Sequence, residues 1–182
     1  VQGVLDGVVA QMSTWEAASD ISRFNRAAIG AWQVMPPDFL TVLSAALRIA
    51  EESGGAFDPT IGAIVDAWGF GAAGPVGSAP DHEATETLRL AAGWRRVACD
   101  TLLQRARRTD TLALDFSGIA KGFGADRAAA WLKSQGFRHF LVEVGGELVG
   151  TGVKPDGQPW WVDIEMPPDA ALPPLRLALH GL

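Results

Sequence analysis

The sequence predicts an α+β fold with mixed helices and a mostly antiparallel sheet. Helical apolar spacing dominates the first part of the chain, and short apolar, β-branched runs flank one long helix in the second part. Because strands and helices do not alternate regularly, a parallel sheet with crossover helices is not expected. With 182 residues, 48% apolar and 20% charged, the chain is long enough for one well-cored domain over residues 1–182.

The helices are predicted from apolar spacing and from the residues that can cap them. Asp58 can cap a helix whose first residue is Pro59, because the first helical position needs no N–H partner. Residues 13–25 are interpreted as a polar loop, and GFGAAGPVGSAP over 69–80 as a long loop or an ordered lid. The predicted helices cover approximately residues 4–12, 38–54, 58–68, 81–93 and 118–136.

The strands are predicted from short apolar runs between turn-forming residues. Asp100, Thr109 and Asp110 separate the runs RRVACD, TLLQRAR and TLALDF. Gly145 and Gly146 are expected to form a hairpin turn between HFLVEVG and ELVGTG. WWVDIEM follows, and the alternating run LRLALHGL at the end of the sequence should be a strand with a partner.

Charge and cysteine content exclude some classes of function. The formal net charge of -6 argues against nucleic acid as a partner, because such binding depends on clustered Lys and Arg. No apolar stretch approaches the ~18 residues that a membrane helix needs. The single cysteine, Cys99, cannot form an internal disulfide, and its apolar surroundings favour a buried thiol over a catalytic one.

The segment DFSGIAKGFGAD, from Asp115 to Asp126, is the best-marked candidate site. It lies where a predicted strand gives way to a helix, and N–H groups at a helix N-terminus attract anions. Lys121 adds a full positive charge. The segment matches neither a Walker loop nor G-x-G-x-x-G. Spacing alone leaves two readings open: a phosphate site, or a tight turn whose glycines serve packing.

Other segments carry weaker candidates. Asp58 suits a helix cap or a ribose or phosphate contact, and Trp15 can stack on a planar ligand or pack on a neighbouring helix. Asn25 is interpreted as a turn cap. Glu143 and Glu147 form an acid–base pair only if they share one strand face. The spacing of the three histidines makes no metal site: His82, His139 and His180.

Taken in order, SDISRFN, GGAFDPTIGAIVDAWGFG, LDFSGIAKGFGADR and FLVEVGGELVGTG resemble the FAD:protein FMN transferases, the ApbE family. The resemblance covers nearly all of residues 1–182 and implies an ApbE-like fold. It implies an Mg²⁺-dependent enzyme that binds FAD, breaks its pyrophosphate and passes FMN to a threonine hydroxyl of an acceptor flavoprotein, releasing AMP. Two alternatives stay open: hydrolysis of FAD to FMN and AMP in the same pocket, and noncatalytic binding of flavin or a partner.

The resemblance also implies roles for particular residues. Trp15 would stack on the flavin, and the backbone carbonyl of Gly118 would bind the metal. No catalytic side chain is implied within the chain, so catalytic residues are expected beyond Leu182. The positions expected to contact FAD are Trp15, Asn25, Ala56, Phe57, Asp58, Thr60, Asp115, Lys121, Gly145 and Gly146.

The sequence departs from the family pattern at its C-terminal end. Family members continue through a Ser-Gly segment to a motif that combines His, Asp-Pro and Thr-Gly, and His180 does not match that motif. We therefore expect the chain to be incomplete at this end. The resemblance further implies a location on the periplasmic side of the inner membrane, with an N-terminal lipid anchor outside this sequence.

Overall fold

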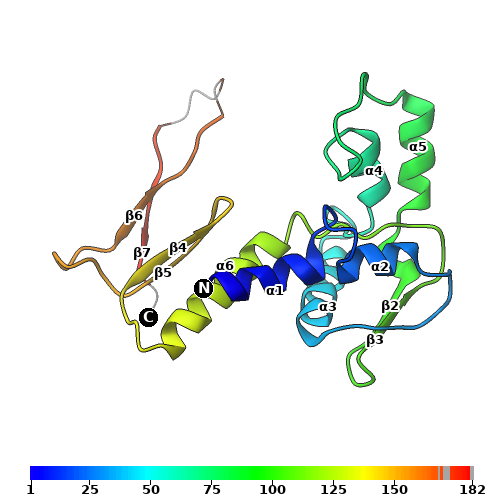
Figure 1. The fold of residues 1–182 in the computed structure, drawn as a ribbon. Helices are drawn as coiled ribbons and strands as arrows, with labels where there is room; N and C mark the ends of the chain where they lie inside the picture. The colour runs from blue at the N-terminus through cyan, green and yellow to red at the C-terminus, as the bar shows by residue number, and fades with distance from the viewer. Residues whose placement is uncertain (168, 170–172, 181–182) are drawn as a thin grey trace. The chain divides into compact units, whose positions relative to one another are not determined.

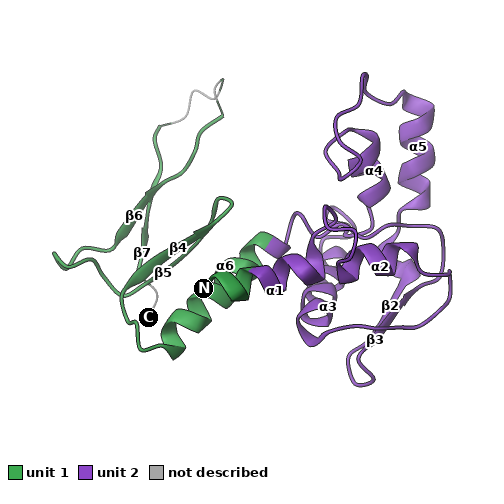
Figure 2. Ribbon diagram, viewed as in Figure 1, with its two compact units in different colours: residues 1–5, 121–182 green, residues 6–120 purple. Residues whose placement is uncertain are grey.

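The computed structural model describes residues 1–167, 169 and 173–180 (Figure 1). The chain forms two compact units: unit 1 holds residues 1–5 and 121–182, and unit 2 holds residues 6–120 (Figure 2). Every strand ladder among the described residues is antiparallel, and these strands are mixed with helices along the chain. The predicted α+β class is therefore confirmed. No helix in the described part of the chain has the length and apolar character needed to cross a membrane.

Most predicted helices of the first 120 residues are present. The helix predicted to resume near Asp81 is α5, and Asp81 caps it by accepting a hydrogen bond from the Ala84 N–H at 2.8 Å. The first, second and fourth predicted helices begin and end within two residues of their expected bounds. The helices are α1 (Gln2–Met12), α2 (Asp20–Arg26), α3 (Pro37–Glu52), α4 (Gly62–Ala67) and α5 (His82–Ala91), with a 3₁₀ turn at Trp94–Arg96.

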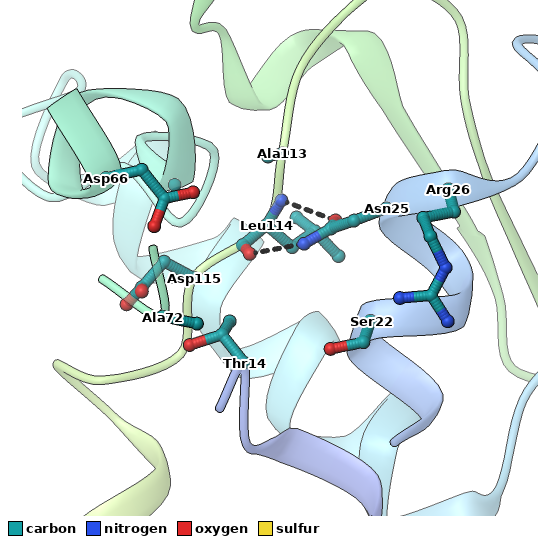
Figure 3. Close-up of a pocket in the computed structure, with 10 residues that line it drawn as sticks. Thr14, Ser22, Asn25, Arg26, Asp66, Ala72, Ala113, Leu114 and Asp115 are labelled. Carbon is teal, nitrogen blue, oxygen red and sulfur yellow. Dashed lines mark hydrogen bonds between the residues drawn. The ribbon is translucent and has the colours of Figure 1, made fainter. Parts of the chain in front are cut away.

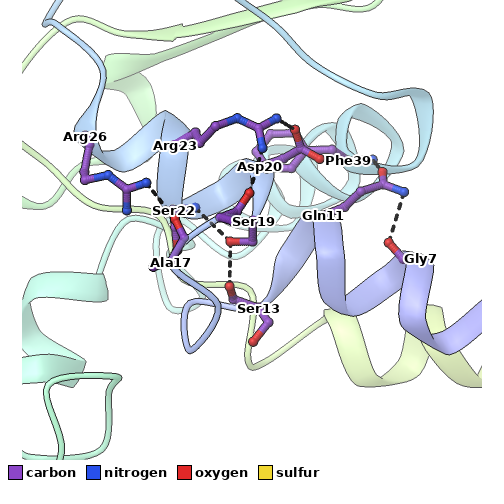
Figure 4. Close-up of polar contacts among 11 residues, drawn as sticks. Gly7, Gln11, Ser13, Ala17, Ser19, Asp20, Ser22, Arg23, Arg26 and Phe39 are labelled. Carbon is purple, nitrogen blue, oxygen red and sulfur yellow. Dashed lines mark hydrogen bonds and ion pairs between the residues drawn. The ribbon is translucent and has the colours of Figure 1, made fainter.

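The polar loop predicted over residues 13–25 is wrong in its second half, which forms α2. Ser19 caps this helix by accepting from the Ser22 N–H at 3.1 Å, and its hydroxyl donates to the Ser13 carbonyl at 2.7 Å (Figure 4). Ile21 and Phe24 are buried one helical turn apart. Two apolar residues are too few to show a helical period, which is why the sequence pattern missed this helix.

The helix predicted to begin at Asp58 begins at Gly62 instead. The Asp58 carboxylate accepts from the N–H of Thr60 at 2.8 Å, so it forms a tight side-chain turn and not a helix cap. Ile61 precedes α4 without a side-chain cap. The predicted loop over residues 69–80 is confirmed.

The sheet of unit 2 has the strand order β1 (Gln33–Val34), β3 (Arg105–Arg108), β2 (Val97–Asp100). Strand β2 falls within the predicted run RRVACD. The run TLLQRAR is a strand only at its end, because residues 101–104 form a turn and β3 extends to Arg108. The third run, TLALDF, is extended but is not a ladder strand, because only Ala113 forms a bridge, parallel to Ile61. The side chain of Asn25 supplies the hydrogen bonds at Leu114 that a neighbouring strand would make.

The core of unit 2 determines which way the Asp115 side chain points. The ring of Phe39 makes tilted contacts with the rings of Phe24 and Phe116, with centroids 6.1 Å and 5.2 Å apart. Leu114 and Phe116 are both buried. Because side chains alternate along an extended segment, Asp115 between them points away from this core.

Unit 1 contains most of α6 (Ala120–Ser134) and two antiparallel hairpins. The helix starts two residues later than predicted, after a turn at residues 117–119. Gly145 and Gly146 have φ angles of 58° and 93° and form the predicted two-residue turn. The predicted last strand pairs with β6, and residues 181–182 of its run lie outside the described residues. The hairpins are β4 (Phe140–Val144) with β5 (Glu147–Thr151), and β6 (Trp160–Asp163) with β7 (Arg176–Leu179).

Candidate functional site

Asp115 lines a small polar cavity in unit 2 (Figure 3). The cavity volume is about 180 Å³. Pockets for drug-sized ligands usually enclose about 300–1,000 Å³, so this cavity can enclose a phosphate-sized group but not a whole dinucleotide. The polar residues that line it come from distant parts of the sequence: Thr14, Ser22, Asn25, Arg26, Asp66 and Asp115.

The carboxylate of Asp115 is held in a fixed place. Asp115 is 9% exposed, and its Oδ1 atom accepts a hydrogen bond from the Ser117 N–H at 2.7 Å. Its own N–H donates to the Pro59 carbonyl at 2.9 Å. The carboxylate therefore lies at the turn before α6, with its backbone tied to the segment that leads into α4.

Asn25 contacts the backbone next to Asp115 and does not cap a local turn, so the turn-cap interpretation is wrong. Its Nδ2 donates to the Leu114 carbonyl at 2.9 Å, and its Oδ1 accepts from the Leu114 N–H at 2.8 Å (Figure 3). The amide thus satisfies both backbone groups of a buried residue. These bonds are the ones that a neighbouring strand would otherwise supply.

The predicted anion site at the start of α6 has fewer available N–H groups than expected. The N–H groups of Ile119 and Ala120 both donate to the Phe116 carbonyl, and the Ser117 N–H donates to Asp115. The nearby carboxylate also repels a phosphate. An anion bound at this turn therefore needs a cation beside it.

Asp58 and Thr60 bind one another and the segment after α5. The Thr60 hydroxyl donates to Asp58 Oδ1 at 2.6 Å and accepts from the Gly93 N–H at 2.7 Å. Asp58 Oδ2 accepts from the Trp94 N–H at 3.3 Å. Thr60 is only 2% exposed. These bonds join two loops of unit 2, and the predicted FAD contacts of both residues stay predictions.

Other predicted site residues of unit 2 lie at the surface or close to Gly118. A Cβ atom at Gly118 would lie 3.3 Å from the Phe57 ring, so the segment with Ala56 and Phe57 packs closely on this turn. Here a glycine does serve packing, which was one of the two readings of the motif. Trp15 is 64% exposed, and its ring is therefore accessible to a ligand.

Lys121, Gly145 and Gly146 come together in unit 1. The Lys121 ammonium donates to the Gly145 carbonyl at 3.2 Å, and Gly146 completes the same turn. The two carboxylates beside this turn, Glu143 and Glu147, do not form the acid–base pair considered from the sequence. Glu143 is opposite Leu148 and Glu147 is opposite Val144, so the two carboxylates lie on opposite faces of the hairpin.

The described residues supply at most part of a magnesium site. Mg²⁺ prefers six oxygen ligands in octahedral geometry, and Gly118 offers one backbone carbonyl. Within the described ranges, no group of three or more His, Cys, Asp or Glu residues could hold a metal ion. The residues present therefore do not by themselves fit an Mg²⁺ ion.

Sequence reasoning missed Asp66 as a residue that lines the cavity. A Cβ atom at Gly71 would lie 1.8 Å from Asp66 Oδ1, so the glycine-rich loop wraps closely around this carboxylate. Ala72 of the same loop also lines the cavity. The glycines of residues 69–80 are the sequence feature that points to this close approach.

Comparison with known proteins identifies the family. The family model described as ApbE family matches residues 1–180. The chain is 34% identical over 175 residues to the FAD:protein FMN transferase of Haemophilus influenzae, covering 92% of this chain and 49% of that protein. It is 35% identical to that of Vibrio cholerae over 169 residues, covering 92% and 50%. The chain thus spans about half the length of the curated relatives it matches.

Solved structures of relatives share the fold. The apo crystal structure of the flavinyl transferase ApbE of Pseudomonas stutzeri matches with a TM-score of 0.86 and 32% identity, covering 98% of this chain and 56% of that one. The flavin transferase ApbE of Vibrio cholerae matches with a TM-score of 0.85 and 34% identity, covering 91% and 53%. The sequence motifs, the fold and these matches agree, and the chain belongs to the ApbE family.

Proposed function

We propose that the protein containing this chain transfers the FMN moiety of FAD to a threonine hydroxyl of an acceptor flavoprotein and releases AMP. The observation that carries the proposal is the buried Asp115 carboxylate, fixed at the turn of the ApbE-like motif and directed into a polar cavity. The names of the relatives, which are FAD:protein FMN transferases, support the same reaction.

In this proposal the threonine oxygen attacks the phosphorus on the FMN side of the pyrophosphate, and the bridging P–O bond breaks. The new bond joins FMN to the acceptor, and AMP leaves. The threonine proton passes to a base, and none of the described residues is assigned this role. Lys121 offsets phosphate charge, because its ammonium keeps further N–H donors beside its bond to Gly145. The part of this chain is to bind and orient FAD.

Mg²⁺ belongs to the proposal as a partner of the pyrophosphate. When bound, it would offset the phosphate charge that otherwise repels Asp115. The Gly118 carbonyl would be one ligand, and the other ligands would come from outside the described residues. The proposal also includes a location on the periplasmic side of the inner membrane with a lipid anchor, which the family resemblance supports.

Trp15 is proposed to stack on the flavin ring, since its exposed indole is accessible for such contact. A Trp15→Ala variant should quench the fluorescence of bound flavin less than the unchanged protein. Trp161→Ala is the matched control, because Trp161 is also partly exposed but has no assigned role. Equal quenching by the unchanged protein and Trp15→Ala would remove stacking from the proposal.

The test of the function is incubation of the protein with FAD, Mg²⁺ and an acceptor that carries the target threonine. Transfer predicts flavin bound covalently to the acceptor, seen as in-gel fluorescence, with AMP in solution. An acceptor with Val in place of the threonine should stay unlabelled. Free FMN and AMP with an unmodified acceptor would show that the protein hydrolyses FAD and does not transfer FMN. Intact FAD would contradict both reactions, and binding would be the remaining function.

A further inference from the structure

The side chain of Asn25 takes the place of a β-strand beside Leu114. A carboxamide carries one carbonyl acceptor and N–H donors, so it can pair with a peptide as a neighbouring strand does. Asn25 makes both bonds, at 2.9 Å and 2.8 Å, across 89 residues of sequence. Leu114 has 0% exposure, so water cannot replace these bonds.

The opposite edge of the same segment is tied to residues 59–62. The Ala113 carbonyl accepts from the Gly62 N–H at 3.0 Å, and the Asp115 N–H donates to the Pro59 carbonyl at 2.9 Å. The extended segment 113–115 is therefore bound along both edges, by backbone on one side and by Asn25 on the other. This arrangement leaves little freedom for the residue that follows Leu114.

We propose that Asn25 is a positioning residue: its amide fixes Leu114 and thereby holds the Asp115 carboxylate where it meets FAD, without binding FAD itself. The proposal rests on the proposed function, in which Asp115 contacts FAD. It differs from the expectation that Asn25 contacts FAD directly, because it assigns the amide to the two bonds with Leu114.

Two variants of Asn25 separate its hydrogen bonds from its shape. Asn25→Ala leaves the buried N–H and carbonyl of Leu114 without partners. Asn25→Asp keeps the shape and the acceptor but removes the donor to the Leu114 carbonyl. Both variants should release segment 113–115, and Asn25→Gln should restore part of the lost function if its longer amide still reaches Leu114.

Arg108 offers a matched control. Its Nη1 donates to the Leu112 carbonyl and its Nη2 donates to the Ala27 carbonyl, each at 2.8 Å. Arg108 thus joins the same two parts of the chain as Asn25, yet makes no bond to residues 113–115. Arg108→Met should destabilise unit 2 without moving Asp115.

The first readout is FAD affinity, measured by titration at a temperature where every variant is folded. Loss of one buried pair of bonds next to the ligand site should weaken FAD binding about tenfold for Asn25→Ala. Arg108→Met should leave the affinity within about twofold. In a protein that already carries Asp115→Ala, adding Asn25→Ala should cause no further loss.

The second readout does not depend on FAD. The ¹³C shift of the Asp115 carboxyl and the hydrogen exchange of the Ser117 N–H, which donates to that carboxyl, should change in both Asn25 variants and stay unchanged in Arg108→Met. If the unchanged protein binds no FAD, the proposed function fails, and this readout still decides the positioning of Asp115.

Three results would overturn the proposal. Affinity losses that add in the double variant would show that Asn25 binds FAD on its own. An equal loss in Arg108→Met would show a general effect of stability. An unmoved Asp115 carboxyl signal in Asn25→Ala would show that the amide does not set the position of this carboxylate.

Discussion

The Lys121 ammonium donates a hydrogen bond to the Gly145 carbonyl at 3.2 Å, across 24 residues of sequence. Lys121 lies in the first turn of α6, and Gly145 lies at the tip of the β4–β5 hairpin. The two residues were predicted from separate motifs as FAD contacts. Their contact in unit 1 places the Lys121 ammonium at the Gly145–Gly146 turn.

Replacing Gly145 by alanine should displace Lys121. The residue has a φ of 58°, and a Cβ atom there would lie 2.9 Å from Lys121 Cδ. Gly145→Ala should lower the free energy of unfolding by about 1–2 kcal/mol, because a left-handed backbone is strained for alanine. Thermal unfolding measures this loss, and the NMR signal of the Lys121 ammonium should shift.

Gly146→Ala serves as the control for this experiment. Gly146 also has a positive φ, of 93°, but nothing lies within 4 Å of a Cβ atom there. This variant should lose stability and leave the Lys121 signal in place. If the Lys121 signal stays unmoved in Gly145→Ala as well, the contact does not hold the ammonium.

Removing the Thr60 hydroxyl should destabilise unit 2. Thr60→Val keeps the shape of the side chain but removes the hydroxyl, which accepts a hydrogen bond from the Gly93 N–H and donates one to Asp58. We expect a loss of about 1–2 kcal/mol in chemical denaturation, because the half-buried Gly93 N–H then loses its acceptor. Thr41→Val, at an exposed helical site, should change stability by less than about 0.5 kcal/mol. Equal effects at the two sites would contradict this account.

The thiol of Cys99 should react slowly. Burial raises its pKa, the hydrogen bond with the Ser44 hydroxyl lowers it in part, and the Asp100 carboxylate raises it further. Since the thiolate is the reactive form, alkylation by iodoacetamide at pH 8 should be about tenfold slower than for free cysteine and should accelerate above pH 9. Ser44→Ala should slow it further at pH 8, because the hydrogen bond that lowers the pKa is lost. A rate equal to that of free cysteine would contradict the burial of this group.

Acid should loosen the β6–β7 hairpin. Arg176 donates to the carboxylate of Asp163 directly across the strand pair, at 2.9 Å for one of its bonds. This hydrogen bond holds the pKa of Asp163 below its ordinary value; burial opposes the shift, and the charge of Arg176 makes a smaller contribution that lowers the pKa further. A lowered folded-state pKa means that the stabilisation is present above the unfolded pKa of about 3.9 and is lost as the pH falls further.

Amide exchange of the β6–β7 strands measures this effect. Protection should be constant from about pH 7 to 5, after correction for the intrinsic exchange rate, and should fall below about pH 4. Because both side chains are exposed, the effect should be small and should weaken in high salt. Asp163→Asn should abolish the pH dependence. A pH dependence that persists in that variant would assign it to another group.

Local chemistry made some elements predictable and left others open. The start of a helix near Asp81 and the Gly145–Gly146 turn depend on residues a few positions apart, so both could be predicted from the sequence. Asp58 had two local options, a helix cap or a tight turn, and its bond to the Trp94 N–H lies 36 residues away. The sequence therefore could not decide between them.

The candidate site shows the same limit. The Asp115 motif could be recognised from its residues, but the pairing of Asn25 with Leu114 spans 89 residues and replaces a strand with a side chain. The spacing of apolar residues along the sequence does not indicate such a contact. For the same reason TLALDF was predicted as an ordinary strand, although an amide side chain binds one of its edges and only a single bridge forms on the other.

The most direct test of the central claim is a titration of the protein with FAD, with and without the Asp115 carboxylate. Asp156→Ala is the control, because Asp156 accepts from the N–H two residues ahead, as Asp115 does, in an exposed turn. We predict that the unchanged protein and Asp156→Ala bind FAD equally, and that Asp115→Ala binds about tenfold more weakly or worse. Equal affinity in all three proteins would contradict the assignment of Asp115 to the FAD site.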